Sequence, residues 1–383
     1  MRAIINSGVS IEIASTWDAI SDRWQALEQQ AYASPFQTAH WIGNWYEAFC
    51  ASGAIEPVIV SVVERSSGRD LMMIPLVRRT ENGVKTIEFA DLWVTDYNAP
   101  LLRSGYSFHG RFEREIWPAI LAALPPADVL ILRKMPVTLG PAMNPLTALS
   151  TVEKSDLCGH IVDVGDDWDA YQSTLSKSVR SAQRRHFKKF VNEHGGRLRR
   201  IKTHDEAIAA LEVLQKQQTE RLTAQGAKHV FDDPRYQELY RRQLLRGLTT
   251  GHAVMFVLES GDGEILSTFL GLSNTKGHHT LVRLSHSQDV QWKSLTLGKL
   301  VVHLTFEALH AEGCRTFDLS VGVNRYKTEF GVTQIPMAEL TAKLSWRGAP
   351  FIARRKAIAY IARKPRLMTL ARTIAGKLQR RAA

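Results

Sequence analysis

Arg315-Thr316-Phe317-Asp318-Leu319-Ser320, followed by Tyr326-Lys327-Thr328-Glu329-Phe330-Gly331, closes the stretch that decides the fold, residues 251–332. Three apolar segments of strand length precede it, separated by glycine-containing turns, at 252–258, 265–272 and 279–285. This alternation predicts an antiparallel meander. Apolar residues then recur at helical spacing before a glycine stop at Gly313: Leu297, Leu300, Val301, Leu304 and Ala308.

The order strand, strand, strand, helix, strand predicts an α+β layer whose sheet can splay around a ligand at the helix N-terminus. The first half of the chain reads as strand, helix, hairpin, helix, strand, and we interpret it as a degenerate copy of the second half. We therefore expect mixed, largely antiparallel sheets flanked by helices, in an N-terminal domain at 1–150 and a C-terminal domain at 151–346. Proline and glycine residues at 136–160 predict a linker between them.

The charge of the chain is concentrated in two segments. The chain has 49 Lys and Arg against 38 Asp and Glu, and residues 347–383 hold eleven Lys or Arg and no acid. This basic tail therefore accounts for the whole net charge of +11, and its apolar stripe predicts an amphipathic helix suited to an anionic membrane surface. A second concentration, at 177–202, has ten Lys or Arg against one acid, Glu193.

Several classes of protein are disfavoured. The three cysteines are far apart, so the sequence predicts neither a disulfide framework nor a cysteine zinc site. No His, Asp or Glu group has convincing ligand spacing, and no metal is expected. Without a signal sequence or a long apolar run, we expect a cytoplasmic protein, with the tail at the inner membrane face.

The chain also carries a series of short motifs: Pro35 to Thr38 with Trp41, Ile74 to Leu76, Asp96-Tyr97 with Pro100-Leu101, and Tyr326-Lys327 before Phe330-Gly331. In this order they resemble the acetyltransferase domain of cellulose- and exopolysaccharide-biosynthesis proteins of the CelD/BcsL type. That family belongs to the GNAT superfamily and is related to the FemAB aminoacyl transferases. The resemblance implies tandem GNAT-like domains and transfer of an acetyl group from acetyl-CoA to an amine or hydroxyl of a polysaccharide or glycan precursor.

The resemblance puts the cofactor at the entry to the helix that follows the meander. The residues there are Trp292, Lys293, Ser294, Leu295, Thr296 and Gly298. A helix N-terminus offers unpaired N–H groups and the positive end of a dipole, which suits a pyrophosphate. The loop has a single glycine where the superfamily usually has more, and the alternative is an ordinary helix capped by Ser294 or Thr296.

Four residues are candidates for catalysis. Lys327 corresponds to a recurrent site position of the family and can present a cation to an oxyanion, and Tyr326 can protonate a leaving thiolate. Asp318 and His286 are candidates for the general base. Asp318 fits a structural ion pair equally well, and His286 can be a packing residue.

Two other functions remain open at this point. In a FemAB-like transferase that uses aminoacyl-tRNA, the basic segment 177–202 would bind the tRNA. That segment can equally pair with acidic residues of the body. A non-catalytic, membrane-associated scaffold of a polysaccharide synthase is the third alternative, and the single glycine of the cofactor loop favours it.

Overall fold

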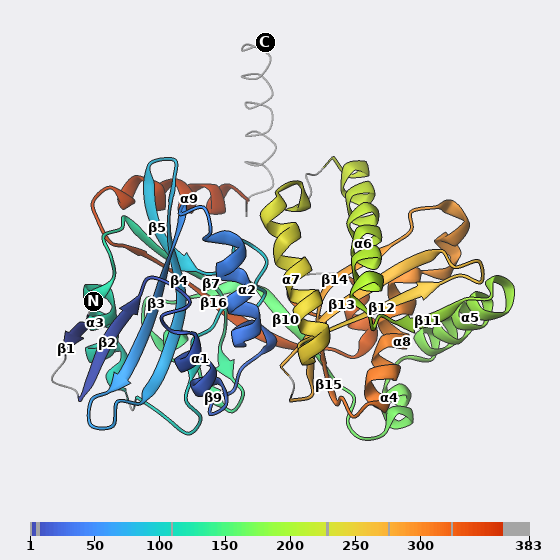
Figure 1. Cartoon of the computed structure of the whole chain (residues 1–383), viewed down its shortest axis with the longest axis horizontal. Coiled ribbons are helices and arrows are strands. Elements are labelled where there is room, and N and C mark those ends of the chain that lie inside the picture. The colour runs from blue at the N-terminus through green and yellow to red at the C-terminus, as the bar shows by residue number, and fades with distance from the viewer. Residues whose placement is uncertain are drawn as a thin grey trace, which may run out of the picture.

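The structure, a computed structural model, describes residues 2–4, 8–108, 110–226, 230–274, 276–322 and 325–362. Two similar halves share one mixed sheet and are flanked by helices (Figure 1). Along the sheet the strands run β1 (Arg2–Ile4), β2 (Val9–Ala14), β3 (Ile55–Glu64), β4 (Asp70–Glu81), β5 (Val84–Phe89), β7 (Val129–Pro136), β16 (Thr333–Lys343), β10 (Glu153–Asp163), β15 (Thr316–Asp318), β14 (His278–His286), β13 (Ile265–Ser273), β12 (Ala253–Glu259) and β11 (Arg197–Arg200). The short β6 (Leu101–Leu102) pairs with β4, and β8 (Thr138–Leu139) pairs with β9 (Ala142–Met143).

Both halves repeat one order of elements. In the first half β2 is followed by two helices, α1 (Ser21–Glu28) and α2 (Ala39–Phe49), then by β3, β4, β5, α3 (Trp117–Ala123) and β7. In the second half β11 is followed by α6 (His204–Ala224) and α7 (Pro234–Thr250), then by β12, β13, β14, α8 (Leu297–Ala311) and β15. The parallel pairs β5·β7 and β14·β15 occupy equivalent places. The predicted α+β class with two similar halves is therefore confirmed.

The halves are joined by crossed strands at the middle of the sheet. β10 follows the first half in the chain but pairs with β15 of the second half, whereas β16 follows β15 but pairs with β7 of the first half. β10 and β16 also pair with each other. The linker predicted at 136–160 is therefore wrong, because β10 begins within it and lies at the centre of the sheet.

Local sequence explains where the helices begin and end. Thr203 and Glu206 form a reciprocal capping box at the start of α6. Asp233 caps α7, which has Pro234 in its first turn and ends at Gly251 in the left-handed region. The remaining short helices are η1 (Pro35–Gln37), η2 (Phe112–Ile116), η3 (Pro145–Ala148), η4 (Val230–Asp232), η5 (Val290–Leu295) and η6 (Arg325–Phe330).

The apolar residues that recur at helical spacing from Trp168 to Phe190 belong to two helices. α4 (Trp168–Thr174) ends at Leu175, and α5 (Lys177–His194) starts anew because Ser176 is extended and its hydroxyl accepts a hydrogen bond from the Val179 amide. α5 then ends at Gly195, in the left-handed region. The interruption turns α5 away from α4 (Figure 1).

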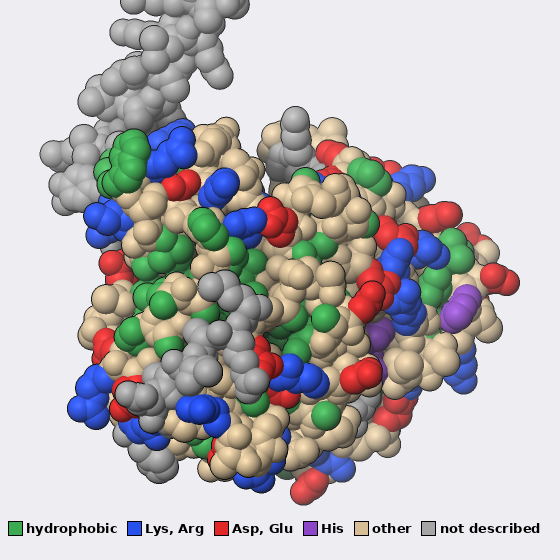
Figure 2. All heavy atoms as spheres, turned by 60° about the vertical axis from the view of Figure 1, so that its left-hand side comes forward, with side chains coloured by type: hydrophobic (Ala, Val, Ile, Leu, Met, Phe, Trp, Pro, Cys, Tyr) green, Lys and Arg blue, Asp and Glu red, His purple; other side chains and the backbone are tan. Residues whose placement is uncertain are grey.

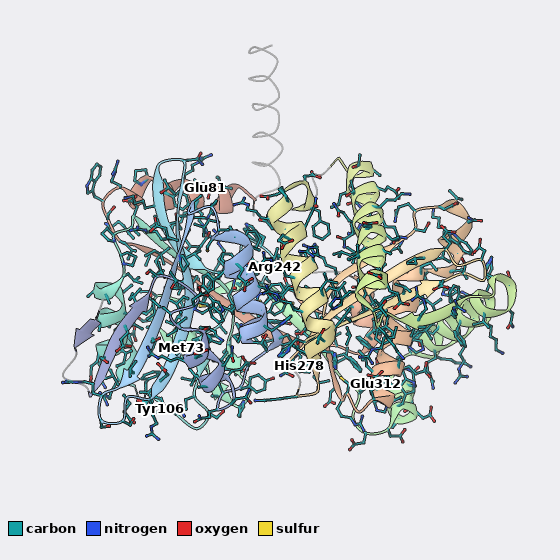
Figure 3. All side chains as sticks on the ribbon, viewed as in Figure 1. Met73, Glu81, Tyr106, Arg242, His278 and Glu312 are labelled. Carbon is teal, nitrogen blue, oxygen red and sulfur yellow. The ribbon has the colours of Figure 1, made fainter. Side chains whose placement is uncertain are left out.

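Helices α2 and α7 pack together at the junction between the halves. The buried Gln243 donates a hydrogen bond to the carbonyl of Trp41 at 3.0 Å, and Arg246 donates one to Asn44 at 2.7 Å. Arg242 forms an ion pair with Glu47, also from α7 to α2 (Figure 3). One apolar core cluster contains residues of both helices, so the two halves share a core.

The last described helix, α9 (Gly348–Ala362), packs against β16. Arg355 of α9 lies 3.9 Å from Glu339 of β16. Most of the basic tail predicted at 347–383, from residue 363 on, lies outside the described residues. No helix in the described ranges is long and apolar enough to cross a membrane. On the face seen in Figure 2, basic and acidic side chains are interspersed.

Candidate active site

A cavity of about 780 Å³ opens in the second half, where β14 and β15 separate. The two strands pair over only three residues, 278–280 with 316–318, so their later parts diverge. The cavity is lined by β14, the segment from η5 into α8, the end of α6, the loop after β15 and η6. This is the splayed sheet with a helix N-terminus that the sequence predicts.

A β-bulge shapes the β14 wall. Leu270 pairs with Arg283 and Gly271 with Leu281, so Val282 is an extra residue in β14. A bulge leaves the ladder locally unpaired and redirects backbone groups. Val282 lies at this bulge and lines the cavity.

Helix α8 begins at the mouth of the cavity. Thr296 precedes it with a φ of 48°, in the left-handed region, and in the described structure no side chain caps the helix. Thr296, Leu297, Gly298 and Lys299 line the cavity. A Cβ on Gly298 would lie 3.2 Å from Cδ2 of His286, so a larger residue would crowd the place where the helix meets the cavity.

Four of the six predicted cofactor residues line the cavity: Trp292, Lys293, Thr296 and Gly298. Leu295 is buried in the core of the second half and does not reach it. The Ser294 hydroxyl instead accepts a hydrogen bond from Lys189 of α5 at 3.1 Å. The alternative of a capped helix is not what the structure has, because neither Ser294 nor Thr296 caps α8.

Lys327 lies at the floor of the cavity and is 3% exposed. Its Nζ donates hydrogen bonds to the carbonyls of Ser320 at 3.1 Å and Val321 at 3.0 Å. Burial lowers its pKa, and the nearby carboxylates of Asp96 and Asp318 act in the opposite direction. The lysine is therefore positioned by backbone and held close to negative charge.

Tyr326 lines the same cavity, and burial raises its pKa to about 12. Its hydroxyl therefore stays protonated at neutral pH and can act as a hydrogen-bond donor. His286 also lines the cavity and is half-buried, with Nδ1 3.1 Å from the carbonyl of Ser287.

Asp318 does not line the cavity. It is 1% exposed, accepts a hydrogen bond from Tyr97 Oη at 2.8 Å and one from the Ser320 amide at 2.6 Å, and lies 3.6 Å from His278 Nε2. His278 is placed at the junction of the two halves in Figure 3. Asp318 is thus part of a buried polar network that ties the first half to the second.

Asp96, from the first half, does reach the cavity. The Ser320 hydroxyl donates a hydrogen bond to it. Burial raises the pKa of Asp96, while Lys134 and Ser320 act in the opposite direction. Sequence reasoning noted Asp96 within a motif but did not assign it to the site, and only the fold brings it there.

Two arginines of the cavity wall were also missed. Nε of Arg221 and Nε of Arg283 are buried and have no hydrogen-bond partner among the described residues. The Arg283 guanidinium lies over the ring of Tyr240, 4.5 Å from its centroid. Together with Lys293, these side chains make the wall suited to an anion, whereas Lys299 is paired with Glu329. The uncapped α8 and the arginines of the cavity wall therefore suit a phosphate-bearing donor.

Helix α5 lies beside the mouth of the cavity. His186 Nδ1 is 2.8 Å from Thr296 Oγ1, and Lys189 contacts Ser294. Of the six Lys and Arg of α5, only Lys189 has an ion pair in the described part of the chain, with Glu193 of the same helix at 3.8 Å. The arginines of β11 pair with Glu259 and Glu312 of the body. The expected pairing with the body thus holds for β11 and not for α5.

No cluster of three or more His, Cys, Asp or Glu that could hold a metal occurs within the described ranges.

Comparisons with known proteins agree with this geometry. Residues 177–328 match the family model of the acetyltransferase (GNAT) domain, a range that includes α5, the cavity and Lys327. No curated protein matches the chain.

Solved structures of similar fold extend over most of the chain. The crystal structure of FemX has a TM-score of 0.57 at 10% identity, covering 83% of this chain and 95% of that one. The C-terminal domain of a putative lysylphosphatidylglycerol synthetase from Agrobacterium fabrum has a TM-score of 0.52 at 12% identity, covering 89% and 96%. L-PGS from Bacillus licheniformis has a TM-score of 0.52 at 13% identity, covering 90% and 97%. At these identities the likeness shows the shared fold. Residues 177–328 thus match a GNAT acetyltransferase domain, and the chain is an acyltransferase.

Proposed function

We propose that the chain transfers an acetyl group from acetyl-CoA to an amine or hydroxyl of a glycan or glycan precursor, in the manner of the exopolysaccharide-biosynthesis enzymes that it resembles. The observation that carries the donor is the N-terminus of α8, which no side chain caps, at a cavity lined by Arg221, Arg283 and Lys293. Backbone N–H groups at such a terminus bind phosphates, and arginine adds charge-assisted hydrogen bonds. The glycan acceptor rests on the sequence motifs alone.

Acyl-CoA, when bound, supplies an acyl group already activated as a thioester. Asp96 is the base: its pKa is raised by burial, so it accepts a proton from the acceptor more readily than an ordinary aspartate does. Ser320 orients it through the hydroxyl hydrogen bond.

Charge that develops during transfer is stabilised by two further groups. We assign this role to the Val282 peptide, at the bulge of β14, and to the Lys327 ammonium, because both residues line the cavity. The Tyr326 hydroxyl, protonated at neutral pH, donates a hydrogen bond to the departing sulfur.

Calorimetric titration with acetyl-CoA tests the donor. Arg221→Ala should weaken binding about 10-fold to 100-fold, since a hydrogen bond to a charged group contributes roughly 1.5–3 kcal/mol. Lys216→Ala is the matched control, because Lys216 is exposed on the same helix and does not line the cavity. Failure of the folded wild type to bind acetyl-CoA would refute the donor, and equal losses in both variants would refute the assignment of Arg221.

A second donor, aminoacyl-tRNA, is favoured by the exposed cations of α5 beside the cavity mouth. Binding of tRNA to such a surface should weaken steeply with salt, because each neutralised phosphate releases a counterion. Gel-shift titrations with unfractionated tRNA at low and high salt test this, with Arg184→Ala and Lys188→Ala against Lys216→Ala. Binding that is absent, or that the α5 substitutions leave unchanged, would exclude this donor.

A further inference from the structure

A second hollow lies on the central strands, apart from the active-site cavity. It measures about 590 Å³ and is lined by residues 154–158 of β10 and by Gln334, Pro336 and Met337 of β16. An irregular pairing opens it: Lys154 pairs with Ala338 and Cys158 with Pro336, so the step along β10 is two residues longer than that along β16. The half-buried Cys158 thus borders a groove wide enough for a small molecule.

The thiol of Cys158 has a histidine beside it. Its Sγ lies 3.7 Å from Nε2 of His160, and the two side chains share a face of β10 because they are two residues apart. His160 is 3% exposed, and its Nδ1 lies 3.1 Å from the carbonyl oxygen of Ser320. A carbonyl only accepts, so a neutral His160 carries its proton on Nδ1 and turns the Nε2 lone pair toward the thiol.

The other two cysteines lack this arrangement. Burial raises the pKa of Cys50 to about 12 and that of Cys314 to about 11. The Cys314 thiol donates to the carbonyls of Gly277 at 3.2 Å and Thr316 at 3.3 Å, which offer no base. Cys50 and Cys314 are therefore internal controls for Cys158.

Cys158 is connected to the active site through one carbonyl. The Ser320 oxygen that accepts from His160 also accepts from Nζ of Lys327. A displaced His160 would therefore disturb the anchor of Lys327. This link depends on the loop after β15, because its residue Ser320 lines the cavity and accepts from both side chains.

We propose that Cys158 is a thiol-modification site, at which His160 activates the thiol for exchange with a low-molecular-weight disulfide bound in the groove. His160 Nε2 takes the thiol proton, and the Cys158 sulfur attacks one sulfur of the disulfide. A new S–S bond forms as the old one breaks, and the other half of the disulfide leaves as a thiolate that takes up a proton. The mixed disulfide then displaces His160 and Ser320 and slows acyl transfer by releasing Lys327, a consequence that rests on the proposed function.

Timed alkylation of the native protein with iodoacetamide, followed by peptide mass spectrometry, tests the reactivity of the Cys158 thiol. Cys158 should react about 10-fold or more faster than Cys50 and Cys314, because the pKa of both control thiols is raised and neither has a base beside it. His160→Gln should slow Cys158 about 10-fold or more at neutral pH while leaving the two controls unchanged. Equal rates at all three cysteines, or no effect of His160→Gln in a protein whose control cysteines remain protected, would overturn the proposal.

The link between modification of Cys158 and the anchoring of Lys327 is tested with glutathione disulfide as the probe. The wild type should gain one glutathione at Cys158, and amine labelling of Lys327 should then rise, whereas Cys158→Ala should show neither change. Labelling reports on Lys327 whether or not the acceptor is known, so its outcome is separable from that of the proposed acyl transfer. Modified protein whose Lys327 labelling is unaltered would refute the link, and protein that takes up no glutathione would refute the site.

Discussion

Substituting Gly159 by alanine should destabilise the protein more than any ordinary Gly→Ala change in a strand. A Cβ at this position would lie 2.6 Å from Cε1 and 2.7 Å from Cζ of Tyr97, and closer still to its hydroxyl. Tyr97 must then move away from Asp318, to which it donates a hydrogen bond of 2.8 Å. Losing a hydrogen bond to a charged group costs about 1.5–3 kcal/mol and overpacking about 1–3 kcal/mol, so the predicted loss is roughly 3 to 6 kcal/mol.

Urea denaturation, followed by tryptophan fluorescence, measures this loss. With a slope of about 3 kcal/mol per molar urea, the midpoint should fall by about 1–2 M. Tyr97→Phe, which removes only the hydrogen bond, should cost about 1.5–3 kcal/mol. In the double variant the combined loss should be smaller than the sum of the two separate losses, because both substitutions remove the same hydrogen bond to Asp318.

Two results would refute the reasoning: a Gly159→Ala variant within about 0.5 kcal/mol of the wild type, or strictly additive losses in the double variant. Either would mean that Tyr97 does not pack against β10 as described. Because Asp96 precedes Tyr97, the same variant should also lower acyl transfer. If Gly159→Ala lowers stability but leaves acyl transfer unchanged, the hydrogen bond between Tyr97 and Asp318 does not position Asp96 in the active site.

Three further predictions follow from the site and from buried histidines. Tyr326→Phe should lower kcat about 10-fold to 100-fold with little change in KM, measured by thiol release from acetyl-CoA; an unchanged kcat would remove Tyr326 from the site. Gly298→Val should weaken acetyl-CoA binding about 10-fold by calorimetry, because its side chain meets His286, and unaltered affinity would contradict the donor position. Burial lowers the pKa of His40, His279 and His303 to about 4, so the unfolded chain binds protons first. The contribution of these histidines to the free energy of unfolding should be complete above about pH 6.5 and should fall toward pH 4, by at most about 1.4 kcal/mol per pH unit for each histidine. His303→Leu should reduce this pH dependence, measured by urea denaturation at pH 7 and pH 5.

Much of the second half could be predicted because its signals are local. The apolar runs separated by glycine turns became β12, β13 and β14, and the helical spacing before Gly313 became α8. Strand β10 could not be predicted in the same way. Its segment contains Lys154, Asp156 and Gly159, and it is a strand because β15 and β16, far along the chain, pair with it on both sides.

The site was predictable only in part, for a related reason. The position of Lys327 follows a recognisable motif, but Asp96 reaches the cavity across the junction of the halves, a contact that no local pattern encodes. Asp318 was a candidate for the general base, a role that needs access to the substrate. β15 lies between β10 and β14, however, and Asp318 is buried there together with Phe317 and Leu319.

The crossed strands decide how far the halves are independent, and we propose that neither folds well alone. Division after residue 150 leaves β10 and β16 with the second half and removes the ladder between β7 and β16. Each piece then exposes an unpaired edge strand from the middle of a sheet, together with the apolar core that α2 and α7 share. We expect 1–150 produced alone to aggregate, and the two pieces produced together to associate and recover acetyl-CoA binding. A soluble, cooperatively unfolding 1–150 fragment would show instead that the first half is an autonomous domain, and the shared core would then be an ordinary interface.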